Sequence, residues 1–210
     1  MSVLRVDSSI QGPLSASSEL ADLVMSELTA ARPDAPVVSR HLAAEPLPAD
    51  AWPTVIGAAG TAPEDRTSEQ EAAVALAGEL ADELRQATVA VLALPLYNWG
   101  VSQHVKTWID LALAGCQQGE PLLAGTPTVL VTTRGGAYGP GTPKHGWDHN
   151  LDYLRRILAD VWQADLTVVE REFTLVGVNP ALDAFHEPAA LMKKEAQEAA
   201  VAAGRALAAR

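Results

Sequence analysis

The sequence predicts an α/β protein with a doubly wound parallel sheet of five strands, organised as one domain over residues 1–210. Three observations predict this fold. Short apolar segments alternate with segments of helical periodicity along the whole chain. The run Val89–Leu94 is apolar without alternation, which is typical of a strand covered on both faces. Polar or glycine-rich turns follow several apolar segments. We expect the strand order 2-1-3-4-5, with helices on both faces of the sheet.

The first expected strand, Val3–Val6, leads through a polar loop into a helix that begins at Ser15 and stops at Pro33. The first-turn amides of a helix lack internal partners and lie at its positive end. Together with the hydroxyls of Ser9, Ser15 and Ser17, these amides suit a phosphate group. The simpler alternative is that Ser15 only caps the helix.

A second strand is expected at Pro36–Arg40, and a long segment rich in proline follows it. Residues His41–Asp65 contain four prolines and two glycines, which predicts an irregular segment. Because loops of this length are usually functional or pack on a partner, we expect Trp52 to be buried against the domain or a second subunit. A helix over Arg66–Gln86 follows.

The central strand Val89–Leu94 ends at Pro95, and the aromatic-amide-aromatic triplet Tyr97, Asn98 and Trp99 follows at once. In open α/β sheets, ligands bind at the carboxyl ends of the strands. The triplet therefore suits a flat ligand that forms hydrogen bonds. The alternative is a plain strand-to-helix turn whose aromatic side chains fill a gap.

Next come a helix over Ser102–Leu113, a loop over Gly115–Gly125 and a fourth strand over Pro127–Thr132. Gly135 and Gly136 follow this strand closely. Adjacent glycines let the backbone approach a ligand and let its amides donate to carbonyl oxygens. The alternative is a flexible surface turn.

The remaining elements complete the alternation of helices and strands. We expect a helix over Trp147–Trp162, a fifth strand over Leu166–Val169 and a final alanine-rich helix over Pro188–Ala208. The segment Arg171–Val178 either extends the fifth strand or forms an edge.

Composition narrows the function classes. The net charge of −11 disfavours nucleic acid as a partner, since phosphate backbones require a basic face. No apolar run approaches the ~20 residues of a membrane span, and the lone Cys116 fits a reducing compartment, so we expect a cytoplasmic protein. His145, Asp148 and His149 lack a further ligand at metal spacing, so no metal site is expected.

With these motifs, the chain resembles the flavodoxin-like FMN-dependent NADH:quinone oxidoreductases, also called FMN-dependent azoreductases. The resemblance implies that one motif holds the FMN phosphate, a second lies along the isoalloxazine and ribityl chain, and a third meets the pyrimidine edge. In that order, the three motifs are Ser8, Ser9, Ser15, Ala16 and Ser17; Pro95, Leu96, Tyr97, Asn98 and Trp99; and Thr133, Arg134, Gly135 and Gly136.

The resemblance also implies a reaction. NADH or NADPH passes a hydride to the flavin and leaves, and a quinone, an azo compound or a related aromatic acceptor then takes two electrons. The flavin carries the chemistry, so no catalytic side chain is expected. The resemblance further implies a homodimer with FMN near the subunit interface. The alternative function is a flavodoxin-like flavin-binding protein or electron carrier without a reductase substrate of its own.

Two departures from the family pattern concern the substrate. Trp99 stands where the family usually has Phe, and the loop Gly115–Gly125 lacks the aromatic residues of the family's longer loop. A later loop instead holds Tyr138, His145 and Trp147, which together with Trp99 are the candidate substrate pocket. A specialised natural-product quinone is one acceptor that such a pocket suits.

Overall fold

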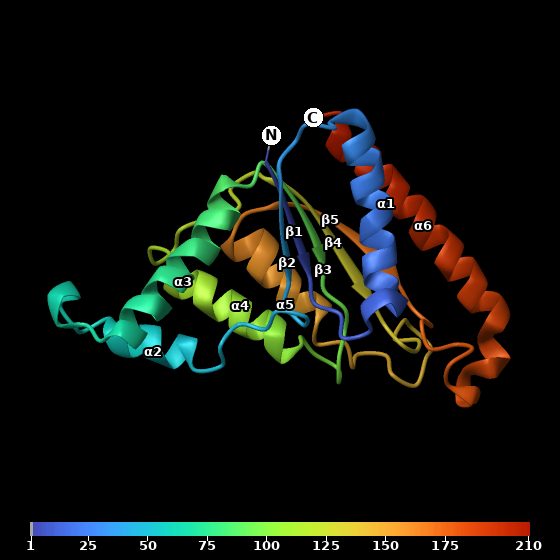
Figure 1. Cartoon of the computed structure of the whole chain (residues 1–210). Coiled ribbons are helices and arrows are strands. Elements are labelled where there is room, and N and C mark those ends of the chain that lie inside the picture. The colour runs from blue at the N-terminus through green and yellow to red at the C-terminus, as the bar shows by residue number, and fades with distance from the viewer. Residues whose placement is uncertain (1) are drawn as a thin grey trace.

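The protein, described over residues 2–210 by a computed structural model, is built on a five-stranded parallel sheet in the order β2-β1-β3-β4-β5 (Figure 1). The predicted doubly wound fold and its strand order are therefore confirmed. The strands are β1 (Val3–Asp7), β2 (Val37–His41), β3 (Val89–Ala93), β4 (Pro127–Thr133) and β5 (Asp165–Arg171). Strand ends differ from the expected ones by only about one or two residues, as is usual for frayed termini.

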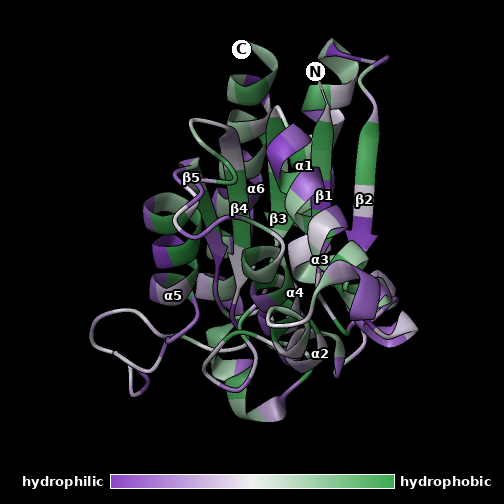
Figure 2. Cartoon of the chain, turned by 90° about the vertical axis from the view of Figure 1, so that its left-hand side faces the viewer, coloured by the Kyte–Doolittle hydropathy of each residue, from purple (hydrophilic) through white to green (hydrophobic). Residues whose placement is uncertain are grey.

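Helices cover both faces of the sheet (Figure 1). One face carries α2 (Ala51–Ala58), α3 (Ser68–Gln86), α4 (Gln103–Ala114) and α5 (Leu151–Arg155), and the other carries α1 (Ala16–Ala31) and α6 (His186–Ala208). Side chains of β3 alternate between the two resulting cores, with Leu92 in one and Val91 in the other. This explains why β3 is hydrophobic along its whole length (Figure 2).

Side-chain caps mark where α1, α3 and α4 begin. Ser15 accepts a hydrogen bond from the Ser18 amide at the start of α1, and Ser102 caps α4 in the same way. Thr67 and Gln70 form a reciprocal capping box at the start of α3. No helix within residues 2–210 is long and apolar enough to cross a membrane.

The segment His41–Asp65 is less irregular than predicted, because it contains α2 and a short 3-10 helix at Pro63–Asp65. Pro53 lies in the first turn of α2, where its missing N–H has no helical partner to lose. Packing of Trp52 against the rest of the domain is also a wrong expectation, since the residue is 45% exposed. Burial against a second subunit stays a prediction.

The helix expected over Trp147–Trp162 begins later, at Leu151, and continues as a π-helix over Arg156–Val161. Its start is set by Asp148, whose carboxylate accepts hydrogen bonds from the amides of Asn150 and Leu151. The final helix, α6, begins two residues before Pro188, which again lies in a first turn.

Arg171 extends β5, as one of the two alternatives predicted, but the segment after it neither continues the strand nor forms an edge. It turns back instead, and the amides of Thr174 and Leu175 donate to the carbonyl oxygens of Arg134 and Gly135, each at 3.1 Å. The segment therefore packs on the turn that follows β4, and this contact builds one wall of the site described next.

Candidate functional site

The three predicted motifs meet in one cleft at the carboxyl ends of β1, β3 and β4. Its volume is about 510 Å³, within the usual range of small-molecule sites. The predicted residues that line it are Ser9, Ala16, Pro95, Leu96, Tyr97, Asn98, Thr133, Gly135, Gly136 and Tyr138. Residues that the sequence did not indicate complete the lining: Ile10, Gln11, Leu14, Lys144, Thr174, Leu175 and Val178.

At the β1 end of the cleft, the side chains of Ser15 and Ser17 form hydrogen bonds within the protein, whereas nearby backbone amides remain free to bind a ligand. The Oγ atoms of Ser15 and Ser17 are buried and lie 3.1 Å apart, and Ser15 also accepts from the Ser18 amide. The capping alternative is thus correct for the Ser15 side chain. Within residues 2–210, however, the amides of Ala16 and Ser17 have no acceptor, and Ala16 lines the cleft. Free first-turn amides at a helix N-terminus suit an anionic group.

Tyr97 links the turn after β3 to the loop after β1. Its hydroxyl accepts a hydrogen bond from the Ile10 amide at 3.0 Å and lies 3.2 Å from the Ser9 Oγ. Ser9 in turn accepts from the Gln11 amide at 3.2 Å. These contacts join two of the three motifs into one continuous wall.

The turn after β3 is a tight, strained one. Tyr97 and Gly100 exchange two backbone hydrogen bonds, at 3.1 and 3.0 Å. The central residues have positive φ angles, 47° at Asn98 and 66° at Trp99. Asn tolerates this left-handed conformation, but a bulky residue such as Trp adopts it at a cost of about 1–2 kcal/mol. Strain of this kind gathers at ligand-binding sites.

Trp99 contributes to a second, open hollow beside the cleft. The Trp99 ring meets the Trp147 ring edge to face, with centroids 6.1 Å apart. The His149 amide donates a hydrogen bond to the backbone carbonyl oxygen of Trp99 at 2.9 Å. The hollow has a volume of about 560 Å³ and shares Asn98 with the cleft. The candidate substrate residues are therefore divided: Trp99 and Trp147 lie together here, Tyr138 lines the cleft, and the exposed His145 lines neither.

The absence of a side chain matters for different reasons at the two glycines that follow β4, Gly135 and Gly136. A Cβ atom on Gly135 would lie 2.6 Å from the Leu175 Cδ1, so this glycine makes room for the segment after β5. A Cβ atom on Gly136 would meet nothing closer than the Lys144 Nζ, at 3.7 Å. Only Gly136 therefore fits the prediction that backbone space is kept open for a ligand.

Arg134 does not direct its side chain into the cleft. The residue is only 5% exposed, and its guanidinium pairs with Asp148 at 2.5 Å and with Glu170 at 2.7 Å. Burial lowers the pKa of Arg134, but the hydrogen bonds and charges of these carboxylates outweigh it and raise the pKa above its ordinary value. Since Asp148 also caps α5, Arg134 ties the turn after β4 to the loop that carries Trp147.

Comparison with known proteins agrees with this geometry. A family described as having the flavodoxin-like fold matches residues 1–198. The chain belongs to this family. It is 41% identical over 188 residues to the FMN-dependent NADH:quinone oxidoreductase of Frankia alni, covering 87% of this chain and 89% of that one. The enzyme of the same name from Frankia casuarinae is 37% identical over 206 residues, covering 96% of each chain.

Solved structures show the same fold. The crystal structure of an azoreductase from Bacillus anthracis superposes with a TM-score of 0.76 and 21% identity, covering 98% of this chain and all of that one. An FMN-dependent NADH-azoreductase from the same species, solved with FMN, gives a TM-score of 0.72 at 16% identity, covering 95% and 98%. The resemblance of the sequence to the FMN-dependent NADH:quinone oxidoreductases is confirmed.

Proposed function

We propose that this protein is an FMN-dependent NADH:quinone oxidoreductase. It binds FMN in the cleft and passes two electrons from NADH or NADPH to a quinone, an azo compound or a related small aromatic acceptor. One observation carries the proposal: the turns after β1, β3 and β4 line a single cleft, each with residues of its motif. The names of the relatives, and the FMN bound to a structure of the same fold, support it.

The residues of the cleft fit this cofactor. The free amides of Ala16 and Ser17 would hold the phosphate, because they are unpaired donors at the positive end of a helix. Asn98, which is exposed within the cleft, would bond to the polar atoms of the ring system. The apolar side chains at the rim would cover apolar parts of the cofactor and exclude water; they are Ile10, Leu14, Leu175 and Val178.

When bound, FMN supplies the hydride and electron chemistry, and the protein binds, orients and tunes it. The strained turn after β3 holds Asn98 against the cleft and Trp99 above the neighbouring hollow. Trp99 and Trp147 offer aromatic surfaces to a flat acceptor, which would lie beside the ring because the hollow and the cleft share Asn98.

Two further proposals concern assembly and location. Trp52 and Ile56 of α2 are 45% and 55% exposed, and an exposed apolar pair of this kind suits a subunit contact, so the protein is a homodimer. Sedimentation of the protein, with Trp52→Ser as the comparison, tests this. The single, unpaired Cys116 fits a reducing compartment, so the protein is cytoplasmic.

The deciding experiment is the visible absorbance of the purified protein after saturation with FMN and removal of the excess, followed by NADH oxidation with a small quinone. One FMN per chain with steady NADH oxidation is the expected result. Retained FMN with almost no turnover would instead identify a flavin-binding protein or electron carrier. A folded protein that retains no FMN would overturn the proposal.

A further inference from the structure

Lys144 is the one charged residue among those that line the cleft within residues 2–210. Its Nζ atom lies 3.7 Å from the position that a Cβ atom on Gly136 would occupy and 5.4 Å from the centre of the Tyr138 ring. The ring face attracts the ammonium group and restricts it to this place. The Lys144 carbonyl also accepts from the Trp147 amide at 3.0 Å, which fixes the backbone of the loop. A cation is thus held at the tip of the turn after β4.

The charge of Lys144 is not neutralised by the protein. The chain has four lysines, and Lys106, Lys193 and Lys194 each reach a carboxylate, at 2.6, 3.1 and 3.8 Å. Lys144 forms no ion pair within 4.0 Å among the described residues, although the protein carries a net charge of −11. A half-buried cation without a partner contributes little to folding stability, so its place in the cleft calls for a ligand of negative charge.

Arg134, the other cation near this turn, is not positioned to contact a negatively charged ligand in the cleft. Arg134 precedes the two glycines, but its guanidinium is committed to Asp148 and Glu170 and lies outside the lining of the cleft. Two acidic residues near the loop are already engaged: Glu172 accepts a hydrogen bond from the Tyr138 amide and lies 3.9 Å from Arg134, and Asp148 pairs with Arg134. Lys144 is therefore the positive group that a ligand in the cleft would meet.

We propose that Lys144 stabilises the negative charge that bound FMN gains on reduction and thereby raises its midpoint potential. This inference rests on the proposed function. The phosphate is expected at Ala16, where the amides are free, so the ring of bound FMN would extend toward the carboxyl ends of β3 and β4, near Lys144. A hydride from NADH brings two electrons and one proton, so the ring gains one negative charge unless it takes up a second proton. A nearby cation favours that reduced state over the neutral oxidised one.

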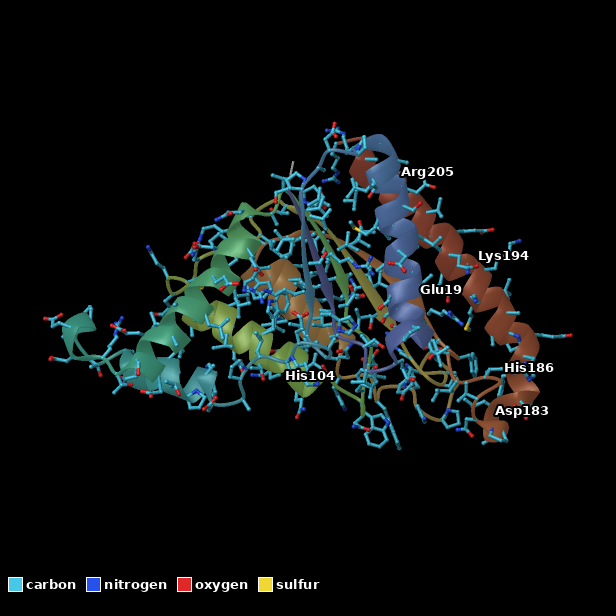
Figure 3. All side chains as sticks on the ribbon, in the orientation of Figure 1. Glu19, His104, Asp183, His186, Lys194 and Arg205 are labelled. Carbon is cyan, nitrogen blue, oxygen red and sulfur yellow. The ribbon has the colours of Figure 1, made fainter. Side chains whose placement is uncertain are left out.

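The test is the two-electron midpoint potential of the FMN-loaded protein, measured by equilibration with reference dyes, together with the affinity for oxidised FMN. Lys144→Met removes the charge and keeps the length of the side chain, and Lys144→Arg keeps the charge. Lys194→Met is the matched control, because it changes the net charge equally from an exposed position on α6 (Figure 3).

We expect Lys144→Met to weaken the binding of reduced FMN about tenfold more than that of oxidised FMN, which lowers the potential by about 30 mV. Lys144→Arg should restore most of this difference, and Lys194→Met should leave the potential unchanged. An unchanged potential in Lys144→Met with normal FMN binding overturns the inference and leaves the proposed function intact. If the wild-type protein binds no FMN, the proposed function itself fails.

Discussion

The turn after β3 exposes the side chains of Asn98 and Trp99 to the cleft and the neighbouring hollow, whereas the turn after β4 buries the side chain of Arg134 and offers its backbone to the cleft. In the first, Asn98 and Trp99 adopt left-handed conformations and are exposed. In the second, Arg134 is buried in ion pairs, and the turn receives hydrogen bonds from the segment after β5. Both turns lie at the ends of adjacent parallel strands, so the strand geometry alone does not explain the difference.

The difference indicates that the turn after β3 mainly contacts the ligand, whereas the turn after β4 mainly stabilises the fold. Side chains that point into solvent are free to meet a ligand, and replacing them removes few contacts within the protein. A buried ion pair is the opposite case, because loss of one partner leaves a charge without compensation. Substitutions on the turn after β3 that add no backbone strain should therefore change ligand binding more than stability, and the loss of Arg134 should chiefly reduce stability.

Arg134→Met gives the largest expected effect on stability. The substitution leaves the carboxylates of Asp148 and Glu170 without their cation, and because Glu170 is 40% exposed and solvated, we expect the free energy of unfolding to fall by about 2 kcal/mol. Urea denaturation measures this fall. Lys106→Met, which removes an exposed pair with Asp110, is the control and should cost no more than about 0.5 kcal/mol. Equal effects of the two substitutions would show that burial gives Arg134 no special weight.

The two glycines after β4 allow a sharper comparison. In Gly135→Ala the new Cβ displaces Leu175, which should cost about 1–2 kcal/mol of stability. Gly136→Ala meets no protein atom closer than 3.7 Å, so stability should hold, but the methyl group enters the cleft and should weaken FMN binding about tenfold. Denaturation and fluorescence titration with FMN measure the two effects. Undiminished FMN affinity in Gly136→Ala would remove this glycine from the cofactor site.

Substitutions of Asn98 test the turn after β3. They distinguish the effect of its backbone conformation from the effect of its side-chain amide on FMN binding. Asn98→Ala should cost about 1 kcal/mol of stability, since Ala tolerates a φ of 47° poorly, whereas Asn98→Gly relieves the strain. Both variants lose the amide, so both should bind FMN about fivefold more weakly, the value of one hydrogen bond. If only the Ala variant lost affinity, the backbone of the turn and not the amide would be responsible.

The sequence predicted the fold well because its signals are local and mutually consistent. The uninterrupted apolar run in β3 reflects burial on both faces, and the polar turns mark the carboxyl ends of the strands. The same logic brought the three motifs to one cleft. The prediction that residues 41–65 are irregular was partly wrong, because a proline in the first turn of a helix, such as Pro53 in α2, cannot be told from a proline in a loop by sequence alone.

The parts of the site that escaped prediction depend on contacts between distant segments. Lys144 lies in a loop without periodicity, and only the folded chain places it beside Gly136. Leu175 and Val178 reach the cleft because the segment after β5 turns back onto the turn after β4. The side chain of Arg134 likewise points away from the cleft, because it pairs with Asp148 and Glu170, which lie 14 and 36 residues further along the chain.

Trp99→Phe gives the smallest expected effect and concerns the acceptor alone. Phe keeps an aromatic ring on the strained turn but reduces the edge-to-face contact with Trp147. We expect the KM for a quinone to rise about threefold, while FMN affinity and the free energy of unfolding stay within error, because this ring lines the open hollow and not the cleft. Steady-state kinetics at saturating NADH measure the change. A loss of FMN affinity equal to that of Asn98→Gly would mean that the hollow and the cleft are one site, and that the turn after β3 recognises the cofactor with both of its exposed side chains.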